Sequence, residues 1–216
     1  NSPAQLLTVT GGSANFTRQL GINTTLTAQS GVTPYTTSHE GSRIQYLVRS
    51  SELLALGMVA GDINSLALKV ISQGSGFQNN FTIKMAHTLA SDINTSSNSN
   101  SYYIEESGLS YVTVNPFVTV YSNNQEPAPA VGWKVYQFSN TFNWNPAYNI
   151  VIEICNNNDV NGSLSNGVGQ NSAVEFSQTS FNSVMGSYDN VNTVCGSLGD
   201  NVISSGRAYR PNMKFG

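Results

Sequence analysis

Aromatic and amide side chains stand next to one another at several places in this sequence. Asn143-Trp144-Asn145 sets an indole between two amides, and Tyr102 and Tyr103 are adjacent rings. Proteins bind sugars through exposed aromatic faces that have amide or carboxylate groups beside them. We therefore predict a ligand-binding site, for carbohydrate in the first instance, at Trp144, Asn143, Asn145, Tyr102 and Tyr103. The alternative is that these rings cap the end of a hydrophobic core.

Trp133 is expected in the core, because it follows Gly132 at the start of an expected strand. Five other tyrosines lie near expected loops or strand ends: Tyr111, Tyr121, Tyr136, Tyr148 and Tyr188. These rings have the same two interpretations, an exposed platform for a ligand or the cap of a core.

The segment 157–162 follows the first half of a calcium-loop pattern. Asn157, Asp159 and Asn161 alternate along it, which puts their oxygens on one side of a tight loop, and Gly162 permits the turn. The second half of the pattern fails, because Val168 stands where a bidentate glutamate is needed. No cofactor is expected, because an Asn-rich turn without metal explains the same residues, and calcium at Asn157, Asp159 and Asn161 is the alternative.

Nucleophilic and zinc chemistry have little support in the sequence. His39 is expected in a polar turn and His87 at the end of a strand, and no Gly-x-Ser-x-Gly elbow is present. The two histidines, Cys155 and Cys195 lack the C-x-x-C and H-x₃-H spacings that zinc sites use. We therefore expect no catalytic residues.

Paired carboxylates are the remaining route to catalysis, as in glycosidases. Glu105 and Glu106 are adjacent, so on a strand their side chains point to opposite faces. Glu153 and Glu175 are able to meet only if their strands are neighbours, and Glu153 has the alternative of simple exposure on the strand that ends at Cys155. A glycosidase needs two carboxyl groups about 5–10 Å apart across one cleft.

The composition excludes several classes of protein. Only 10% of the 216 residues are charged and the formal net charge is −3, while 27 Asn, 29 Ser and 17 Thr supply the polarity. Such a chain has too few cations for a surface that tracks nucleic-acid phosphates. No apolar run approaches the length of a membrane span. With 39% hydrophobic residues the chain is able to bury a core.

Period-two alternation predicts an all-β fold, an antiparallel β-sandwich or jelly roll with about ten strands. Within 149–155, Ile150, Ile152 and Ile154 are expected to face the core. One short helix is expected after Ser50 or Ser51 as its N-cap. The clearest strands cover 43–49, 65–71, 80–87 and 149–155, with weaker ones at 5–10, 109–114, 132–138, 173–178, 181–186 and 208–215. We expect a single domain over 1–216, in which 1–42 forms an N-terminal strand extension.

Cys155 and Cys195 are the only two cysteines of the chain. In an oxidising compartment they are able to close a loop as a disulfide, and in a reducing one they would be two buried thiols. The Lys-poor surface, rich in Asn, Ser and Thr, favours the extracellular setting and the disulfide.

Eight phrases, in this order along the chain, resemble a β-sandwich module that recurs in large secreted surface proteins of the Bacteroidota. The phrases lie at 46–53, 60–68, 80–88, 132–133, 142–144, 149–156, 179–184 and 209–215, and include NFTIKMAHT, NIVIEICN and YRPNMKF. The similarity covers about residues 43–215. It implies an extracellular jelly-roll-like fold, export by type IX secretion and a role in surface display, adhesion or ligand binding, and it carries no catalytic residues.

The leading interpretation is a non-enzymatic extracellular module of a secreted surface protein, acting in adhesion or in binding carbohydrate or another ligand. One alternative is a structural or self-assembling stalk or filament unit, and another is a glycan hydrolase that would use Glu153 and Glu175. The expected partners are a glycan, another surface ligand or neighbouring modules. Neither nucleic acid nor direct membrane insertion is expected.

Overall fold

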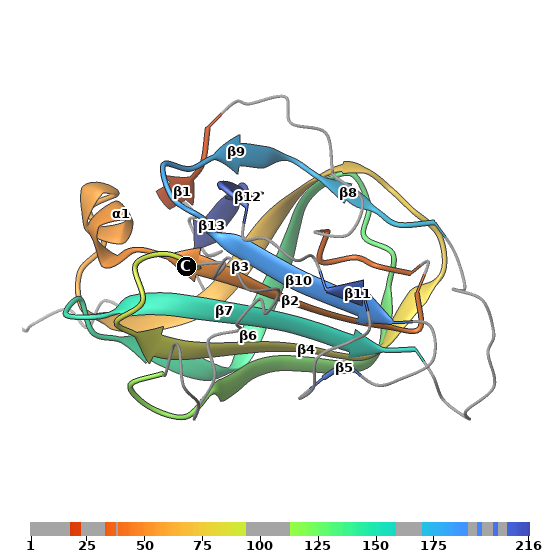
Figure 1. The fold of residues 1–216 in the computed structure, drawn as a ribbon, viewed down its shortest axis with the longest axis horizontal. Helices are drawn as coiled ribbons and strands as arrows, with labels where there is room; N and C mark the ends of the chain where they lie inside the picture. The colour runs from red at the N-terminus through yellow and green to blue at the C-terminus, as the bar shows by residue number, and fades with distance from the viewer. Residues whose placement is uncertain are drawn as a thin grey trace, which may run out of the picture.

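Thirteen strands and one short helix make up the regular structure of the described residues. The computed structural model describes residues 18–22, 33–37, 39–93, 113–158, 170–189, 194–195, 201–202 and 207–216. Every strand pair in this part of the chain is antiparallel. Two sheets lie one behind the other, with a small third sheet beside them (Figure 1). The predicted all-β sandwich is confirmed.

The first sheet has five strands, in the order β1 (Arg18–Leu20), β13 (Met213–Phe215), β3 (Gly61–Ser72) and β6 (Gly132–Trp144), with β8 (Ala173–Val174) also paired to β3. The second sheet has six, in the order β11 (Asn201–Val202), β10 (Val184–Asp189), β2 (Gly41–Val48), β7 (Asn149–Asn157), β4 (Phe77–Thr88) and β5 (Val118–Pro127). The third sheet pairs β9 (Phe176–Gln178) with β12 (Tyr209–Pro211).

The main core lies between the two large sheets, where alternate residues of their strands meet. On β7, Ile150, Ile152 and Ile154 belong to this core, as the alternating sequence predicts. The opposite face of β7 is buried as well, because Val151 packs with Leu47 of β2 in a second cluster. Burial on both sides explains why this strand is almost continuously apolar.

The N-terminal region contributes to the same core. Leu20, at the end of β1, and Tyr35 both belong to the main cluster of buried residues. β1 pairs with β13 at the edge of the five-stranded sheet, so a strand from this region extends that sheet.

β5 is the strand that the sequence pattern misses. It is the last strand of the six-stranded sheet, and only its first half alternates, with Val120 buried. Its second half is Ser-Asn-Asn-Gln-Glu-Pro, which an edge strand tolerates because one side of it has no partner strand. The strand expected at 109–114 lies mostly outside the described residues, and Thr113 forms only an isolated bridge with Thr88. The strand expected at 5–10 lies outside them entirely.

The helix α1 (Ser50–Ala55) is present, with a different start from the predicted one. Its N-cap is Arg49, and the backbone N–H of Arg49 donates to Glu52 Oε2 at 2.9 Å. Ser50 is inside the helix and its hydroxyl donates to the carbonyl of Pro146. The acidic residue in the first turn therefore replaces the predicted serine cap. Within the described residues, no helix is long and apolar enough to cross a membrane.

A buried ionic cluster joins the two large sheets where β5 approaches β6. Lys134 of β6 lies with its Nζ 2.6 Å from Glu126 Oε1 of β5. Tyr121 and Asn123 both donate to Glu126 Oε2 at 2.8 Å. Glu126 is only 1% exposed, so these three partners compensate a carboxylate that is removed from water.

Candidate ligand-binding surface

Trp133 lies on the outer face of the five-stranded sheet. On β6, Tyr136 faces the core, so Trp133 and Val135 point to the other side by strand alternation. Trp133 pairs in register with Lys69 of β3 and is half-buried. The expectation that Trp133 is a core residue is therefore wrong, because the residues of β6 that face the core here are the even-numbered ones, such as Tyr136 and Phe138.

Two lysines stand over the indole of Trp133. Lys214 Nζ lies 4.2 Å from the ring centroid and Lys69 Nζ lies 5.7 Å from it. Both distances are within the range in which an ammonium is attracted by an aromatic face. Lys214 is on β13, two strands away from Trp133, so this contact spans the width of β3.

The row of residues next to the ring combines polar and apolar side chains, and its Ala67 is buried beneath its neighbours. Gln19, Lys214, Ala67 and Val135 occupy one row across β1, β13, β3 and β6. Four adjacent strands make a strip about 14 Å across. Val135 is 42% exposed, so apolar area is open to solvent beside the lysines. We call the face formed by Trp133, Lys69, Lys214 and Val135 the Trp133 surface.

Neither Lys69 nor Lys214 forms an ion pair with the described residues. The other two lysines do, Lys84 with Glu153 and Lys134 with Glu126. Glu175 donates its backbone N–H to the carbonyl of Lys69, but its carboxylate accepts the Asn212 amide at 2.7 Å. Among the described residues, therefore, no carboxylate competes with an external anion for these two ammonium groups.

Trp144 is a core residue in the structure. It is 1% exposed, and its indole N–H donates to the carbonyl of Tyr148 at 3.3 Å. A buried ring offers no face to a sugar, so of the two interpretations of Trp144 the structure supports the core cap. Strand alternation explains the result, since Phe142, Trp144 and Tyr136 all face the interior from β6.

The amides on either side of Trp144 are on the surface, but each has a local partner. Asn143 donates from Nδ2 to Asp62 Oδ1 at 2.8 Å. Asn145 accepts from the backbone N–H of Ala147, which forms a turn. Tyr102 and Tyr103 lie outside the described residues.

The disulfide is present between Cys155 and Cys195, as predicted. Cys155 is buried near the end of β7, and the bond attaches residue 195 to the six-stranded sheet. Asn157, the first residue of the predicted calcium loop, ends β7 and is half-buried. Asp159 and Asn161 lie outside the described residues, and in the described part no group of three His, Cys, Asp or Glu is placed to hold a metal. Calcium remains a prediction.

Glu153 and Glu175 do not meet. Glu153 is on β7 of the six-stranded sheet, whereas Glu175 lies between β8 and β9, and β8 pairs with β3 of the other sheet. Glu153 is also not exposed, because it is 3% accessible and lies 2.6 Å from Arg43 Nη2. Gln45 donates to it at 2.9 Å, so this carboxylate is part of a buried ionic cluster.

Both histidines are held by neighbouring rings and backbone. His87 Nε2 accepts the backbone N–H of Asn145 at 3.0 Å, and its ring lies 4.8 Å from that of Phe142. Burial lowers the pKa of His87, and the ring is neutral in this arrangement. His39 packs against Tyr188 at 4.0 Å between centroids, and burial lowers its pKa as well.

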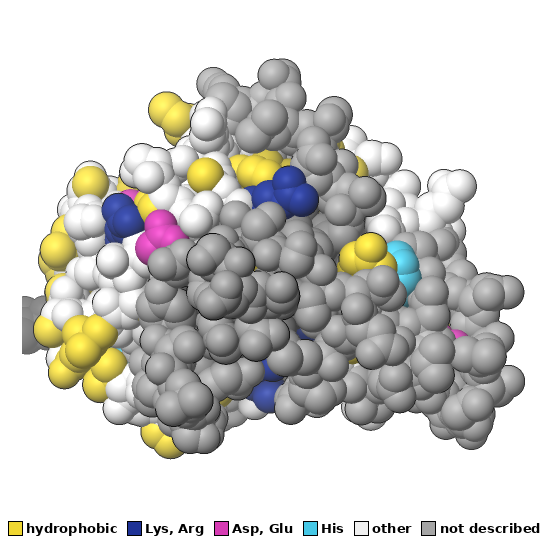
Figure 2. Space-filling model, in the orientation of Figure 1, with side chains coloured by type: hydrophobic (Ala, Val, Ile, Leu, Met, Phe, Trp, Pro, Cys, Tyr) yellow, Lys and Arg dark blue, Asp and Glu magenta, His cyan; other side chains and the backbone are white. Residues whose placement is uncertain are grey.

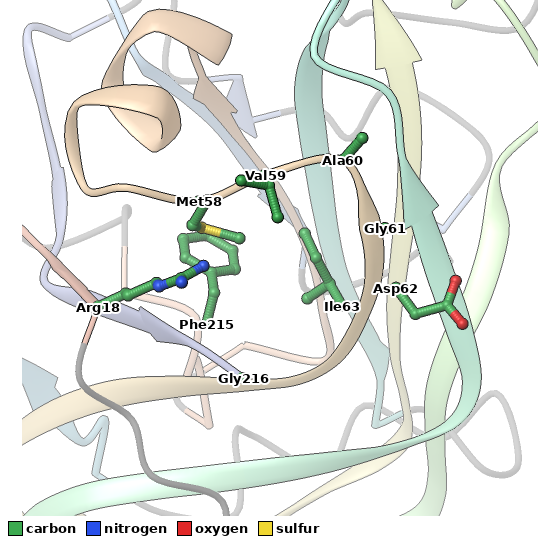
Figure 3. A pocket seen from close by; sticks show the side chains of 9 residues that line it. All are labelled: Arg18, Met58, Val59, Ala60, Gly61, Asp62, Ile63, Phe215 and Gly216. Carbon is green, nitrogen blue, oxygen red and sulfur yellow. The ribbon is translucent and has the colours of Figure 1, made fainter.

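A cavity of about 360 Å³ opens at the end of the sandwich that carries α1. Arg18, Met58 and Phe215 point toward one another in it, while Asp62 points away (Figure 3). Hydrophobic side chains gather at this end of the molecule, where Leu54 and Val59 are exposed (Figure 2). Phe215 is only 2% exposed, so the cavity lacks the open ring face that would hold a sugar. The Trp133 surface is therefore the stronger candidate.

Comparison with protein-family models, with curated proteins and with solved structures found no match for this chain.

Proposed function

We propose that this chain is a non-enzymatic extracellular module of a secreted surface protein, and that it binds carbohydrate through the Trp133 surface. The observation that carries the proposal is the half-buried indole of Trp133 on the outer face of the five-stranded sheet, next to two lysines that pair with no carboxylate among the described residues. Lys214 lies over the indole, so a sugar ring would pack against the part of Trp133 that stays accessible and against the exposed Val135, with the two lysines as polar neighbours. The Cys155–Cys195 disulfide supports an oxidising location outside the cell.

The surroundings of the carboxylates favour binding over hydrolysis. A glycosidase requires two carboxyl groups that face one cleft. Glu153 is instead enclosed by Arg43 and Gln45, and Glu175 accepts from Asn212. These contacts support a structural role for both side chains.

The sheet edges favour a binding module over a self-assembling unit. β1 and β11 are the outer strands at one end of each large sheet, and they are only three and two residues long. At the other ends, β6 approaches β5, because Ser139 and Asn140 of β6 donate to carbonyls of Val120 and Thr119. Short or covered edges reduce the strand pairing that builds filaments.

Glycan-array binding of the wild-type chain and of Trp133→Ala tests the proposal. We expect binding by the wild type and a loss of at least about tenfold in Trp133→Ala. Leu89→Ala is the control, because Leu89 is 73% exposed at the end of the other sheet and its truncation leaves the Trp133 surface intact. The proposal would be refuted if the wild-type chain binds no glycan. It would also be refuted if Trp133→Ala binds glycan as well as the wild type does.

The full-length gene product that contains this chain provides a second test, of where the protein is displayed. We propose display on the surface of a bacterium of the Bacteroidota after type IX secretion, on the resemblance of the phrases at 43–215. A full-length gene product with a C-terminal sorting domain would support this, and a cytosolic full-length product would contradict it.

A further inference from the structure

We propose that the ligand of the Trp133 surface is an anionic polysaccharide, whose carboxylate or sulfate groups bind between Lys69 and Lys214. The inference rests on the proposed function and narrows its ligand to one chemical class. The sugar ring that carries the anion packs beside the indole of Trp133 and the exposed side chain of Val135.

The arrangement of charge carries the inference. Lys69 and Lys214 both approach the same ring centroid, so their ammonium groups are less than about 10 Å apart. That separation is no longer than the screening length at about 0.1 M salt, so the two positive charges repel one another and act together on one anion. An anionic group bound beside them reduces this repulsion and gains a charge-assisted hydrogen bond from each ammonium that it reaches.

Lys69 and Lys214 differ from most other described cations of the chain, which form ion pairs. The sequence has only 9 Lys and Arg and a net charge of −3. Four of these cations pair with buried or half-buried carboxylates in the described residues: Arg43, Lys84, Lys134 and Arg210. Lys69 and Lys214 lie instead on two different strands, and both reach the one half-buried ring of Trp133. A neutral sugar would make no use of their charge.

The small number of cations on the Trp133 surface favours a sugar polymer over nucleic acid. Two cations neutralise too few phosphates for useful affinity to a duplex. The accessible side chains of this row, Gln19, Lys214 and Val135, include an amide and an apolar group beside the charge. A polysaccharide with an anion on each repeat is able to place one charged sugar on the lysines and its neighbours along the strip.

Affinity electrophoresis of the full chain against four polymers tests the inference. The probes are polygalacturonate for carboxylate, dextran sulfate for sulfate, and dextran and xylan as neutral polymers. We expect retardation by at least one of the two anionic polymers, weakened about tenfold in the double variant Lys69→Gln/Lys214→Gln. Raising the salt from 50 to 200 mM should weaken binding about sevenfold, as two released counterions predict.

Arg207→Gln is the matched control, because Arg207 is exposed, is on the other side of the sandwich next to Val184, and carries one positive charge. It should bind like the wild type. Trp133→Ala, which keeps both lysines, separates a built site from simple ion exchange and should lose binding as well. Binding that survives in Trp133→Ala, or that falls equally in Arg207→Gln, would overturn the inference.

The outcomes also separate this inference from the proposed function. Trp133-dependent binding to a neutral polymer with no preference for the anionic ones would overturn the anionic ligand and leave carbohydrate binding standing. Absence of binding to all four polymers and on the glycan array would overturn both. Lysine-dependent binding to anionic lipid vesicles without binding to any polymer would also overturn both.

Discussion

Lys134 Nζ of β6 lies 2.6 Å from Glu126 Oε1 of β5, and this ion pair joins the two large sheets near the buried rings of Tyr136 and Tyr35. Tyr136 donates its hydroxyl to Tyr35 at 3.0 Å, and burial raises the pKa of both tyrosines. Lys134 Nζ also lies 5.2 Å from the Tyr136 ring centroid. Lys134, Glu126 and the two tyrosine hydroxyls thus form a group of polar side chains at one side of an otherwise apolar core.

Removal of Lys134 alone should destabilise the fold by about 3 kcal/mol, because it leaves Glu126 buried without its cation. Lys134→Met is the test, measured by urea unfolding. The double variant Lys134→Met/Glu126→Leu should recover most of the loss, since the buried charge is gone. A Lys134→Met variant as stable as the wild type would show that the ion pair contributes nothing.

The two tryptophans should respond in opposite ways to truncation. Trp144→Ala should lower the free energy of unfolding by about 4 kcal/mol, because Trp144 is 1% exposed in the main core. Trp133→Ala should cost about 1 kcal/mol or less, since Trp133 is half-buried on an outer face. The comparison requires only thermal or urea unfolding of the two variants. Equal losses would contradict the assignment of Trp144 to the core and Trp133 to the surface.

The disulfide should be intact in the native protein and should stabilise it. The unreduced mass is expected about 2 Da below that of the all-thiol chain. Cys155→Ser/Cys195→Ser should lower the stability by about 4 kcal/mol, because the bond closes a loop with a sequence separation of 40. Two titratable thiols in the native protein would refute the bond. Reduction of the wild type should reproduce the stability of the double variant.

Stability should fall as the pH drops below about 6.5, in part through His87. Its pKa in the folded state is lowered by burial, so below pH 6.5 the unfolded chain takes up a proton before the folded chain does. The contribution of neutral His87 is therefore complete above pH 6.5 and is lost as the pH falls through the folded pKa. His87→Gln keeps an acceptor for the Asn145 N–H and should flatten the profile between pH 7 and 5.

His39→Gln is the companion variant, because burial lowers the pKa of His39 in the same direction. Each single variant should remove part of the slope and the double variant should remove more. A His87→Gln profile parallel to that of the wild type would show that His87 does not contribute.

Calcium binding at Asn157, Asp159 and Asn161 predicts a metal-dependent melting temperature. A loop with one carboxylate should bind in the millimolar range, so 10 mM calcium should raise the Tm by about 3 °C. Asp159→Asn should abolish the rise. Identical melting curves of the wild type in EDTA and in calcium would exclude the site.

The pattern of the chain determined the β-sandwich, because alternation along 65–71, 80–87 and 149–155 depends only on which residues avoid water. It also limited the fold to one short helix, and the two cysteines with a polar, uncharged surface favoured the disulfide. The edge strand β5 escaped prediction, since its second half is mostly exposed, and its buried residue there is the charged Glu126.

Only the tertiary structure decided which tryptophan faces solvent. The motif Asn143-Trp144-Asn145 and the dipeptide Gly132-Trp133 give no phase for β6, and a strand shifted by one residue exchanges its two faces. Lys69, Lys214 and Trp133 come from three strands that are far apart in sequence, and register alone brings them together. The composition alone shows that the polar residues are mostly neutral Asn, Ser and Thr. The position of the few cations that would bind an anion depends on how the strands are paired.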